Sequence, residues 1–221
     1  MTERDRIDGI RADYDRIARE YARRLYNELK DKPLDCDLLR RFAAATGGRG
    51  TVCDMGCGPG HVARLLRDSG AEVFGLDLSP GMIAEARRLN PDIDFREGNM
   101  LALPLNDGEL AGIAAFYAIV NLPVELLPTA FDGMHRALAP GGLLLLAFHA
   151  GDEVIRPGER FGQAISMEFF CFPQVVVRTL LVQAGFEIEE VVERGPYAPE
   201  VEFQSNRSYI FARKPGQTPG E

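Results

Sequence analysis

The chain of 221 residues is 46% hydrophobic, which suits one domain with a buried core, and its formal net charge is −8. An acidic balance of 33 Asp and Glu against 25 Lys and Arg disfavours nucleic acid as a partner, because nucleic-acid affinity rests on clustered basic side chains. No apolar run approaches the roughly 20 residues that span a bilayer, and no secretory leader opens the chain. We therefore expect a cytoplasmic protein that acts on a small molecule, without a membrane partner.

The first predicted element is a helix over residues 7–29. Its apolar side chains recur at steps of three and four, which places them on one helical face. They are Ile7, Ile10, Tyr14, Ile17, Tyr21 and Leu25.

Residues 50–185 then alternate between β-branched or apolar runs, glycine or proline turns, and stretches with helical spacing. Strands are predicted at 50–56, 71–79, 93–100, 110–120 and 143–149. Helices are predicted at 59–70, 80–90, 123–142 and 173–185. Such βαβ alternation is typical of a parallel sheet between two layers of helices.

The last two predicted strands, 186–195 and 207–215, have no helix between them, so we expect them to pair antiparallel at the sheet edge. The predicted fold class is thus α/β, a Rossmann-like three-layer sandwich with a seven-stranded, mostly parallel sheet and an antiparallel edge hairpin. We expect one domain over residues 1–213 and a disordered tail at 214–221.

The four cysteines give little support for a disulfide framework or a metal site. They are scattered along the chain, and the spacing of Cys53 and Cys57 is not CxxC. We expect no metal.

The stretch "VCDMGCGPG" at residues 52–60 places Gly56, Gly58 and Gly60 directly after the first predicted strand. In an open α/β sheet this turn lies closest to the ligand, and glycine lets the backbone approach it. His61 breaks the dinucleotide fingerprint GxGxxG, and no Walker A motif is present. Alone, the turn is also compatible with a purely structural role.

Two further strand ends carry polar groups suited to a nucleoside. Asp77 closes the second predicted strand, 17 positions beyond Gly60, where a carboxylate can accept both ribose hydroxyls. At the end of the third strand, Asn99 can accept from an adenine amino group, and the backbone N–H of Met100 can donate to a ring nitrogen. An Asp that only caps the following helix is the alternative for Asp77.

With these residues in place, the chain resembles the class I S-adenosylmethionine-dependent methyltransferases over roughly residues 10–213. The resemblance rests on "VCDMGCGPG", Asp77, "GNMLALP", "ALAPGGLLLLAF" and "LVQAGFEIEEV". It implies that S-adenosylmethionine lies across the end of the first strand. The same resemblance implies a lid helix within residues 1–30 and a substrate cap at 150–172.

The resemblance also implies roles for individual residues. The methionine ammonium would lie near Asp54, the amino-acid moiety along Gly56, Cys57 and Gly58, and the sulfonium near Tyr117. Leu78 and Met82 would flank the adenine. Tyr14 and Tyr21 are lid candidates that can equally be part of the buried stripe.

The sequence departs from the family pattern at two positions. Asn99 stands where Asp is usual, which keeps an acceptor oxygen but removes the charge. "NLPV" at 121–124 lacks the Asn-Pro-Pro-aromatic motif of enzymes that methylate amino groups of nucleic acids. Both motif and charge therefore favour a small-molecule acceptor over a nucleic acid.

Methyl transfer needs a general base only if the acceptor must lose a proton. His149 follows a predicted strand on the ligand-binding edge, and Glu168 lies in an aromatic segment of the cap. A histidine that only bonds a loop is the alternative. Two rival functions also remain, a noncatalytic S-adenosylmethionine-binding or regulatory protein and a nicotinamide-dependent oxidoreductase.

Overall fold

The structure, a computed structural model, describes residues 2–216. Seven strands of this region form one sheet with the order β10-β11-β5-β4-β1-β2-β3. They are β1 (Val52–Met55), β2 (Val73–Asp77), β3 (Asp94–Glu97), β4 (Leu110–Phe116), β5 (Leu138–Ala150), β10 (Glu187–Arg194) and β11 (Asn206–Arg213).

Strands β1 to β5 are mutually parallel, and β11 is antiparallel to both of its neighbours, β5 and β10. The predicted three-layer α/β fold with an antiparallel edge hairpin is therefore confirmed. β1 and β4 are fully buried because both faces of a parallel sheet are covered by helices.

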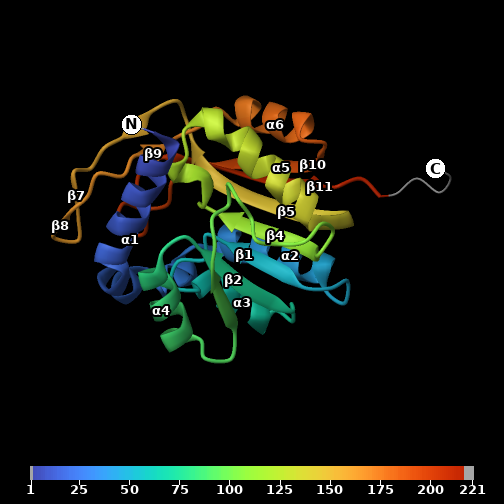
Figure 1. The fold of residues 1–221 in the computed structure, drawn as a ribbon, viewed down its shortest axis with the longest axis horizontal. Coiled ribbons are helices and arrows are strands. Elements are labelled where there is room, and N and C mark those ends of the chain that lie inside the picture. Colours follow the sequence, from blue (N-terminus) through green and yellow to red (C-terminus); the bar gives the residue numbers. More distant parts are fainter. Residues whose placement is uncertain (1, 217–221) are drawn as a thin grey trace.

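Six α-helices surround the sheet in the described part of the chain. They are α1 (Glu3–Leu25), α2 (Pro33–Thr46), α3 (His61–Asp68), α4 (Pro80–Leu89), α5 (Leu127–Ala137) and α6 (Gln174–Gln183). Figure 1 shows α5 and α6 over one face of the sheet and α2, α3 and α4 over the other. Helix α1 crosses the end of the sheet and contacts α4.

Helix α2 is absent from the elements that the sequence analysis predicts. It begins at Pro33. The N–H groups of a helix's first turn have no partner within the helix, so the missing N–H of proline costs nothing there. Leu38, Leu39 and Phe42 of this helix are completely buried in the core on the α3 side. The helix matters for function because its first turn lies at the ligand edge of the sheet.

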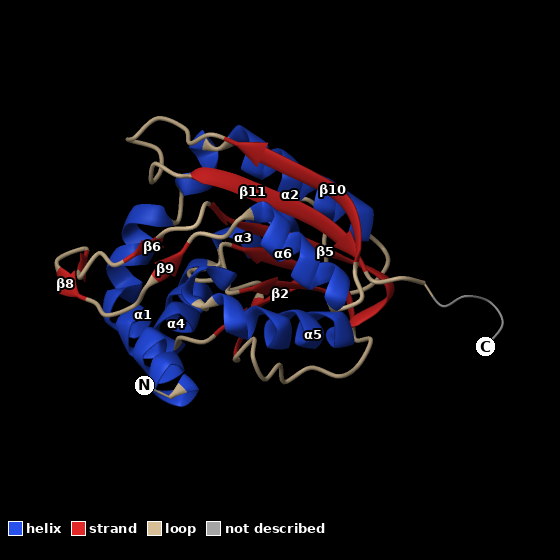
Figure 2. Ribbon diagram, turned by 90° about the horizontal axis from the view of Figure 1, so that it is seen from above, coloured by secondary structure: helices blue, strands red, loops and turns tan. Residues whose placement is uncertain are grey.

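The segment at 150–172, which we define as the cap, forms two small antiparallel pairs. β6 (Val154–Ile155) pairs with β9 (Phe169–Phe170), and β7 (Glu159–Arg160) pairs with β8 (Gln163–Ala164). Figure 2 shows β6, β8 and β9 beside α1. Short 3-10 turns complete the chain, η1 (Glu28–Asp31), η2 (Ile119–Asn121) and η3 (Val124–Leu126).

Two features of the ends and the surface complete the description. Lys214, assigned above to the tail, is anchored, because its N–H donates to Gly142 O at 3.0 Å and its Nζ to Leu138 O at 2.8 Å. The rest of the predicted tail from residue 217 onward lies outside the described residues.

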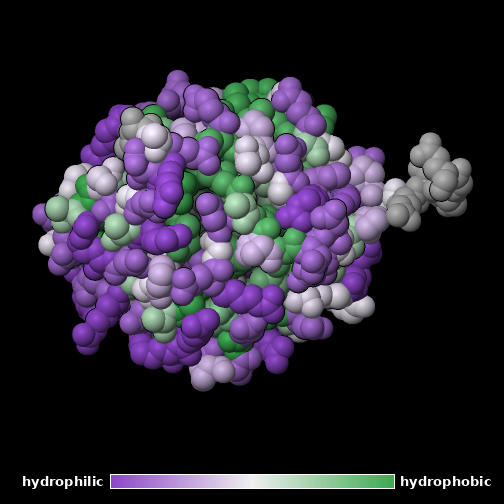
Figure 3. Space-filling model, in the orientation of Figure 1, coloured by the Kyte–Doolittle hydropathy of each residue, from purple (hydrophilic) through white to green (hydrophobic). Residues whose placement is uncertain are grey.

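The face in Figure 3 is largely hydrophilic, with small hydrophobic areas between polar side chains. No helix of residues 2–216 is long and apolar enough to cross a bilayer.

Candidate functional site

A cavity opens at the carboxyl ends of β1 to β4, between these strand ends and the N-terminal segment. Its walls come from the loops after the four strands and from α1, η1 and the first turn of α2. The structure brings together eleven of the twelve predicted cofactor-binding residues along its lining: Tyr14, Tyr21, Gly56, Cys57, Gly58, Asp77, Leu78, Met82, Asn99, Met100 and Tyr117.

The glycine turn after β1 needs its glycines for two different reasons. Gly56 has φ +70°, and a Cβ there would lie 2.7 Å from the Ala118 Cβ, so the turn passes directly against the end of β4. Gly58 has φ +51°, and the place of its Cβ is open space with no heavy atom within 4 Å. The turn thus leaves room for a ligand beside its backbone.

Asp77 lies at the end of β2 with both carboxylate oxygens engaged. Oδ2 accepts the backbone N–H of Gly58 at 2.8 Å, and Oδ1 accepts the N–H of Ser79 at 2.9 Å. Burial raises the pKa of Asp77 to about 6 despite these two bonds. The N-cap of α4 is Ser79, whose hydroxyl accepts from Met82 N, so Asp77 is not the capping residue.

The turn after β3 orders Asn99. Its Oδ1 accepts the backbone N–H of Leu101 at 2.9 Å, and its carbonyl accepts from Ala102 N at 3.0 Å. This fixes the amide orientation, with the oxygen turned toward backbone donors and a second lone pair left for another donor.

Asp54 is the one predicted cofactor residue that does not line the cavity. It is 1% exposed and accepts the N–H of Ala63, in the first turn of α3, at 2.8 Å. Burial raises its pKa to about 7. Asp54 therefore links the end of β1 to the start of α3. The resemblance instead implied a place beside the methionine ammonium, at the cavity surface.

Five charged or polar side chains on the cavity wall were not predicted as site residues, namely Glu28, Lys32, Asp35, His61 and Asn121. Glu28 accepts from Lys32 Nζ at 2.6 Å, and its Oε1 lies 3.2 Å from His61 Nε2. Burial opposes ionisation of Glu28, but His61 and Lys32 outweigh it and lower the pKa of Glu28 to about 2. The Nδ1 atom of His61 is buried without a hydrogen-bond partner among the described residues.

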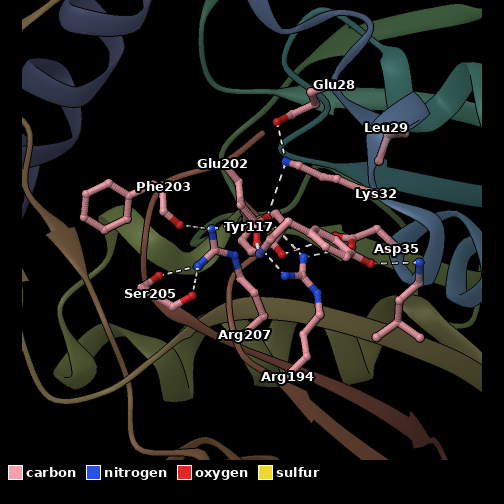
Figure 4. Close-up of polar contacts among 12 residues, drawn as sticks. Glu28, Leu29, Lys32, Asp35, Tyr117, Arg194, Glu202, Phe203, Ser205 and Arg207 are labelled. Atoms are coloured by element: carbon pink, nitrogen blue, oxygen red, sulfur yellow. Dashed lines mark hydrogen bonds and ion pairs between the residues drawn. The ribbon is translucent and has the colours of Figure 1, made fainter. Parts of the chain in front are cut away.

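These groups continue into a buried charge network that reaches the β10–β11 hairpin (Figure 4). Glu202, on the loop between the two strands, pairs with Arg194 and, at 3.4 Å, with Arg207. Its other near neighbour is Lys32, at 3.9 Å. Ion pairs of alternating sign therefore connect the β10–β11 hairpin to Lys32 on the cavity wall.

Asp35 extends the same network to Tyr117, the residue that the resemblance places near the sulfonium. It is completely buried and pairs with Arg194 at 2.9 Å. The hydroxyl groups of Tyr117 and Tyr209 lie 3.3 and 3.0 Å from Asp35 Oδ1. Tyr117 has φ +56°, a backbone conformation rare for a non-glycine residue, which turns its ring into the cavity wall.

Helix α1 is held over the cavity by hydrogen bonds to η2 and to the cap. The hydroxyl of Tyr14 donates to Asn121 Oδ1 at 2.7 Å, and Asn121 Nδ2 donates to the carbonyl of Glu168 in the cap at 2.8 Å. Asp13, 3% exposed, accepts the backbone N–H groups of Ser166 and Met167. Lid helix and cap are thus joined to each other as well as to η2.

His149 ends β5 just outside the cavity lining. Its ring centroid is 5.3 Å from that of Tyr117, and its Nδ1 is 2.7 Å from Ser205 Oγ. Burial and the charge of Arg207 lower the pKa of His149 to about 3. Such an imidazole is neutral at physiological pH and a weak proton acceptor, and its role as a base stays a prediction. Glu168, the second candidate, accepts from Arg6 and Arg156 instead.

Comparison with known proteins agrees with this architecture. Residues 52–142 match the methyltransferase domain family. A malonyl-[acyl-carrier protein] O-methyltransferase of Enterobacter lignolyticus is 34% identical over 149 residues, 66% of this chain and 55% of the relative. A trans-aconitate 2-methyltransferase of Methylobacterium nodulans is 37% identical over 135 residues, 60% of this chain and 49% of the relative. The chain thus spans about half the length of these curated relatives.

A solved S-adenosylmethionine-dependent methyltransferase from Mesorhizobium loti superimposes with a TM-score of 0.65 at 25% identity, over 80% of this chain and 96% of that one. Sheet order, glycine turn and strand-end acid define an α/β protein of the nucleoside-binding type. Together with the family match over residues 52–142, these features support a class I S-adenosylmethionine-dependent methyltransferase, whose cofactor is S-adenosylmethionine.

Proposed function

We propose that this protein transfers a methyl group from S-adenosylmethionine to a small-molecule acceptor. The observation that carries the proposal is the gathering of eleven residues, from α1 and four different strand ends, along one cavity. The open space beside Gly58 and the carboxylate of Asp77 fit the amino-acid and ribose parts of this cofactor.

The residue roles follow the strand ends. Asp77 accepts the ribose hydroxyls, and Leu78 and Met82 flank the adenine. Asn99 accepts from the adenine amino group, and the Met100 N–H donates to its ring. The backbone at Gly56, Cys57 and Gly58 lines the amino-acid moiety, and Tyr117 lies beside the sulfonium.

Glu28, Lys32 and His61 form one wall of the cavity, and we assign to them the contacts with the charged methionine end of the cofactor. They take the place that the resemblance implied for Asp54. The methionine moiety is a zwitterion, and this wall offers carboxylate and ammonium groups side by side at the cavity surface. The buried Nδ1 of His61, unpartnered among the described residues, is a further polar contact for it.

When bound, S-adenosylmethionine supplies an activated methyl group on a sulfonium, which is left as the neutral thioether of S-adenosylhomocysteine. The task of this chain is alignment and exclusion of water. Well-oriented reactants recover about 7–11 kcal/mol of the barrier, which is why a general base is not obligatory. Tyr14 and Tyr21 serve that task by covering the cavity from α1.

Several relatives are named for different acceptors, malonyl-acyl-carrier protein, trans-aconitate and demethylmenaquinone, so none of these is carried over to this chain. The rival functions differ in measurable ways. A regulatory protein binds the cofactor without consuming it, and a nicotinamide enzyme binds NAD.

The test is ligand-dependent stability followed by turnover. A ligand that binds only the folded state adds about 2.7 kcal/mol at a hundredfold excess over its Kd. S-adenosylhomocysteine should raise the melting temperature and NAD should not. Labelled S-adenosylmethionine with a metabolite pool should then yield labelled product. No shift with millimolar S-adenosylhomocysteine would refute the proposal, and binding without turnover would favour the regulatory alternative.

A further inference from the structure

Arg160, on β7 of the cap, lies in a cage of aromatic rings. Its guanidinium carbon is 5.6 Å from the ring centroid of Tyr21, 5.0 Å from that of Phe161 and 5.4 Å from that of Phe169. The side chain is half-buried, and three rings around a planar guanidinium restrict its orientation.

No described residue accepts a hydrogen bond from the Arg160 side chain or pairs with its charge, and its Nε is buried without a partner. The neighbouring arginines differ. Arg156 of the cap pairs with Glu168, Arg16 of α1 with Asp13, and Arg24, which also lies over Phe161, with Glu20. The guanidinium of Arg160 thus has aromatic partners but no carboxylate partner among the described residues, so it can pair with the negative charge of a ligand.

Arg160 is not itself part of the cavity lining, but its guanidinium lies over the ring of Tyr21, which is. Tyr21, one ring of its cage, lines the cavity, and Phe169 belongs to β9 of the cap. The ends of β4 and β5 below carry Tyr117 and His149. After burial, Arg207, Lys32 and Arg160 all lower the pKa of His149, and Glu202 opposes them. Three cations and one carboxylate therefore act on His149, whereas the hydroxyl of Tyr117 lies 3.3 Å from the carboxylate of Asp35.

Resting on the proposed function, we infer that the methyl acceptor is an oxyanion-bearing small molecule, a carboxylate or a phosphate, and that Arg160 is the residue that selects it. A guanidinium binds such groups in bidentate fashion with two parallel N–H donors. In the aromatic cage its fork is already oriented, so little side-chain entropy is lost when the anion arrives. The opposing interpretation is that Arg160 only packs the cap against α1.

The experiment uses the full chain saturated with S-adenosylhomocysteine. Glutarate and inorganic phosphate are titrated at constant ionic strength, with the neutral diamide glutaramide as the matched probe, and affinity is read from melting temperature and calorimetry. Both acids, or one of them, should bind and the diamide should not. A response to glutarate alone assigns a carboxylate, and a response to phosphate alone assigns a phosphate.

Arg160→Gln should weaken binding of the acid at least about tenfold, because the partner charge is lost, while affinity for S-adenosylhomocysteine stays within a few-fold. Without any anion this variant should melt no lower than the parent, since an uncompensated charge has been removed. Arg24→Gln is the matched control, because it also removes a guanidinium from the Phe161 ring, and it should keep the response to the acid.

Equal responses to acid and diamide in the parent protein, or the same response to acid in Arg160→Gln as in the parent, would overturn the inference. If Arg160→Gln does not fold, Arg160→Lys keeps the charge without the fork and should bind the acid more weakly, with parent-like binding counting against the inference. Failure of the proposed function appears separately, as a protein that S-adenosylhomocysteine does not stabilise.

Discussion

Protonation of Asp77 should compete with cofactor binding, which makes this residue testable by pH as well as by mutation. The ribose hydroxyls need an ionised carboxylate as acceptor, and burial raises the pKa of Asp77 in the free protein to about 6. Ionised Asp77 is therefore the majority form at pH 7 and the minority form at pH 5. Binding at low pH must first remove a proton.

The magnitude follows from linkage. One pKa unit corresponds to about 1.4 kcal/mol, so the Kd for S-adenosylhomocysteine should be flat above pH 7 and rise toward tenfold per pH unit below pH 6. Asp77→Asn removes the charge, and charge-assisted hydrogen bonds are worth about 1.5–3 kcal/mol each, so affinity at pH 7.5 should fall about 10- to 150-fold. In this variant the rise of the Kd at low pH should disappear.

Calorimetric titration of S-adenosylhomocysteine from pH 5 to 8 measures both effects. Asp92→Asn is the control, because Asp92 is exposed and pairs with Arg64, and it should keep the parent's affinity and slope. A parent Kd that stays constant across this range, or parent-like affinity in folded Asp77→Asn, would refute the reasoning. A slope that persists in Asp77→Asn would point to Asp54, whose pKa is about 7.

Three further outcomes are expected. Cofactor should increase hydrogen-exchange protection across residues 6–28, since binding lids come from the less stable parts of a structure, and equal protection with and without it would make α1 ordinary core. Gly56→Ala should lower stability by at least about 2 kcal/mol in chemical denaturation, because its Cβ would meet Ala118 at 2.7 Å in a left-handed backbone, and a smaller loss would show that the turn can shift. His149→Gln should reduce kcat/KM about 10²-fold or more if His149 is a base, with unchanged cofactor affinity, whereas activity within a few-fold from pH 5 to 9 would leave alignment as the device.

The local patterns of the sequence are sufficient for the order of elements. Glycine turns and apolar runs are short-range signals, so most strands and helices fall near the predicted ranges. The predicted helix over 123–142 is wrong at its end, because α5 stops at Ala137 and residues 138–142 begin β5, where Leu138 pairs with Leu110 of β4. Helix α2 was not predicted, although Pro33 at the first turn and Leu38, Leu39 and Phe42 at helical spacing were a readable signal.

The residues of the cavity wall show the same difference between readable and unreadable signals. Residues on the strand ends, such as Asp77 and Asn99, could be assigned because parallel strands bring their carboxyl ends to one edge whatever the side chains are. Glu28 and Lys32, four positions apart, indicate only a local ion pair. Nothing in their spacing says that this pair faces a cavity.

The sequence by itself therefore determined the α/β class, the edge of the sheet at which the cavity opens, and most of the residues that line this cavity and are predicted to bind the cofactor, because periodicity and strand ends are local properties. Only the tertiary structure decided that Asp54 faces the start of α3 instead of the cavity, and that Glu202 comes from the distant hairpin to meet Lys32. It also placed Arg160 among three rings without a counter-ion among the described residues. Burial and the pairing of charges depend on which segments meet in space, and a contact such as that of Lys32 with Glu202, far apart in the chain, leaves no period in the sequence.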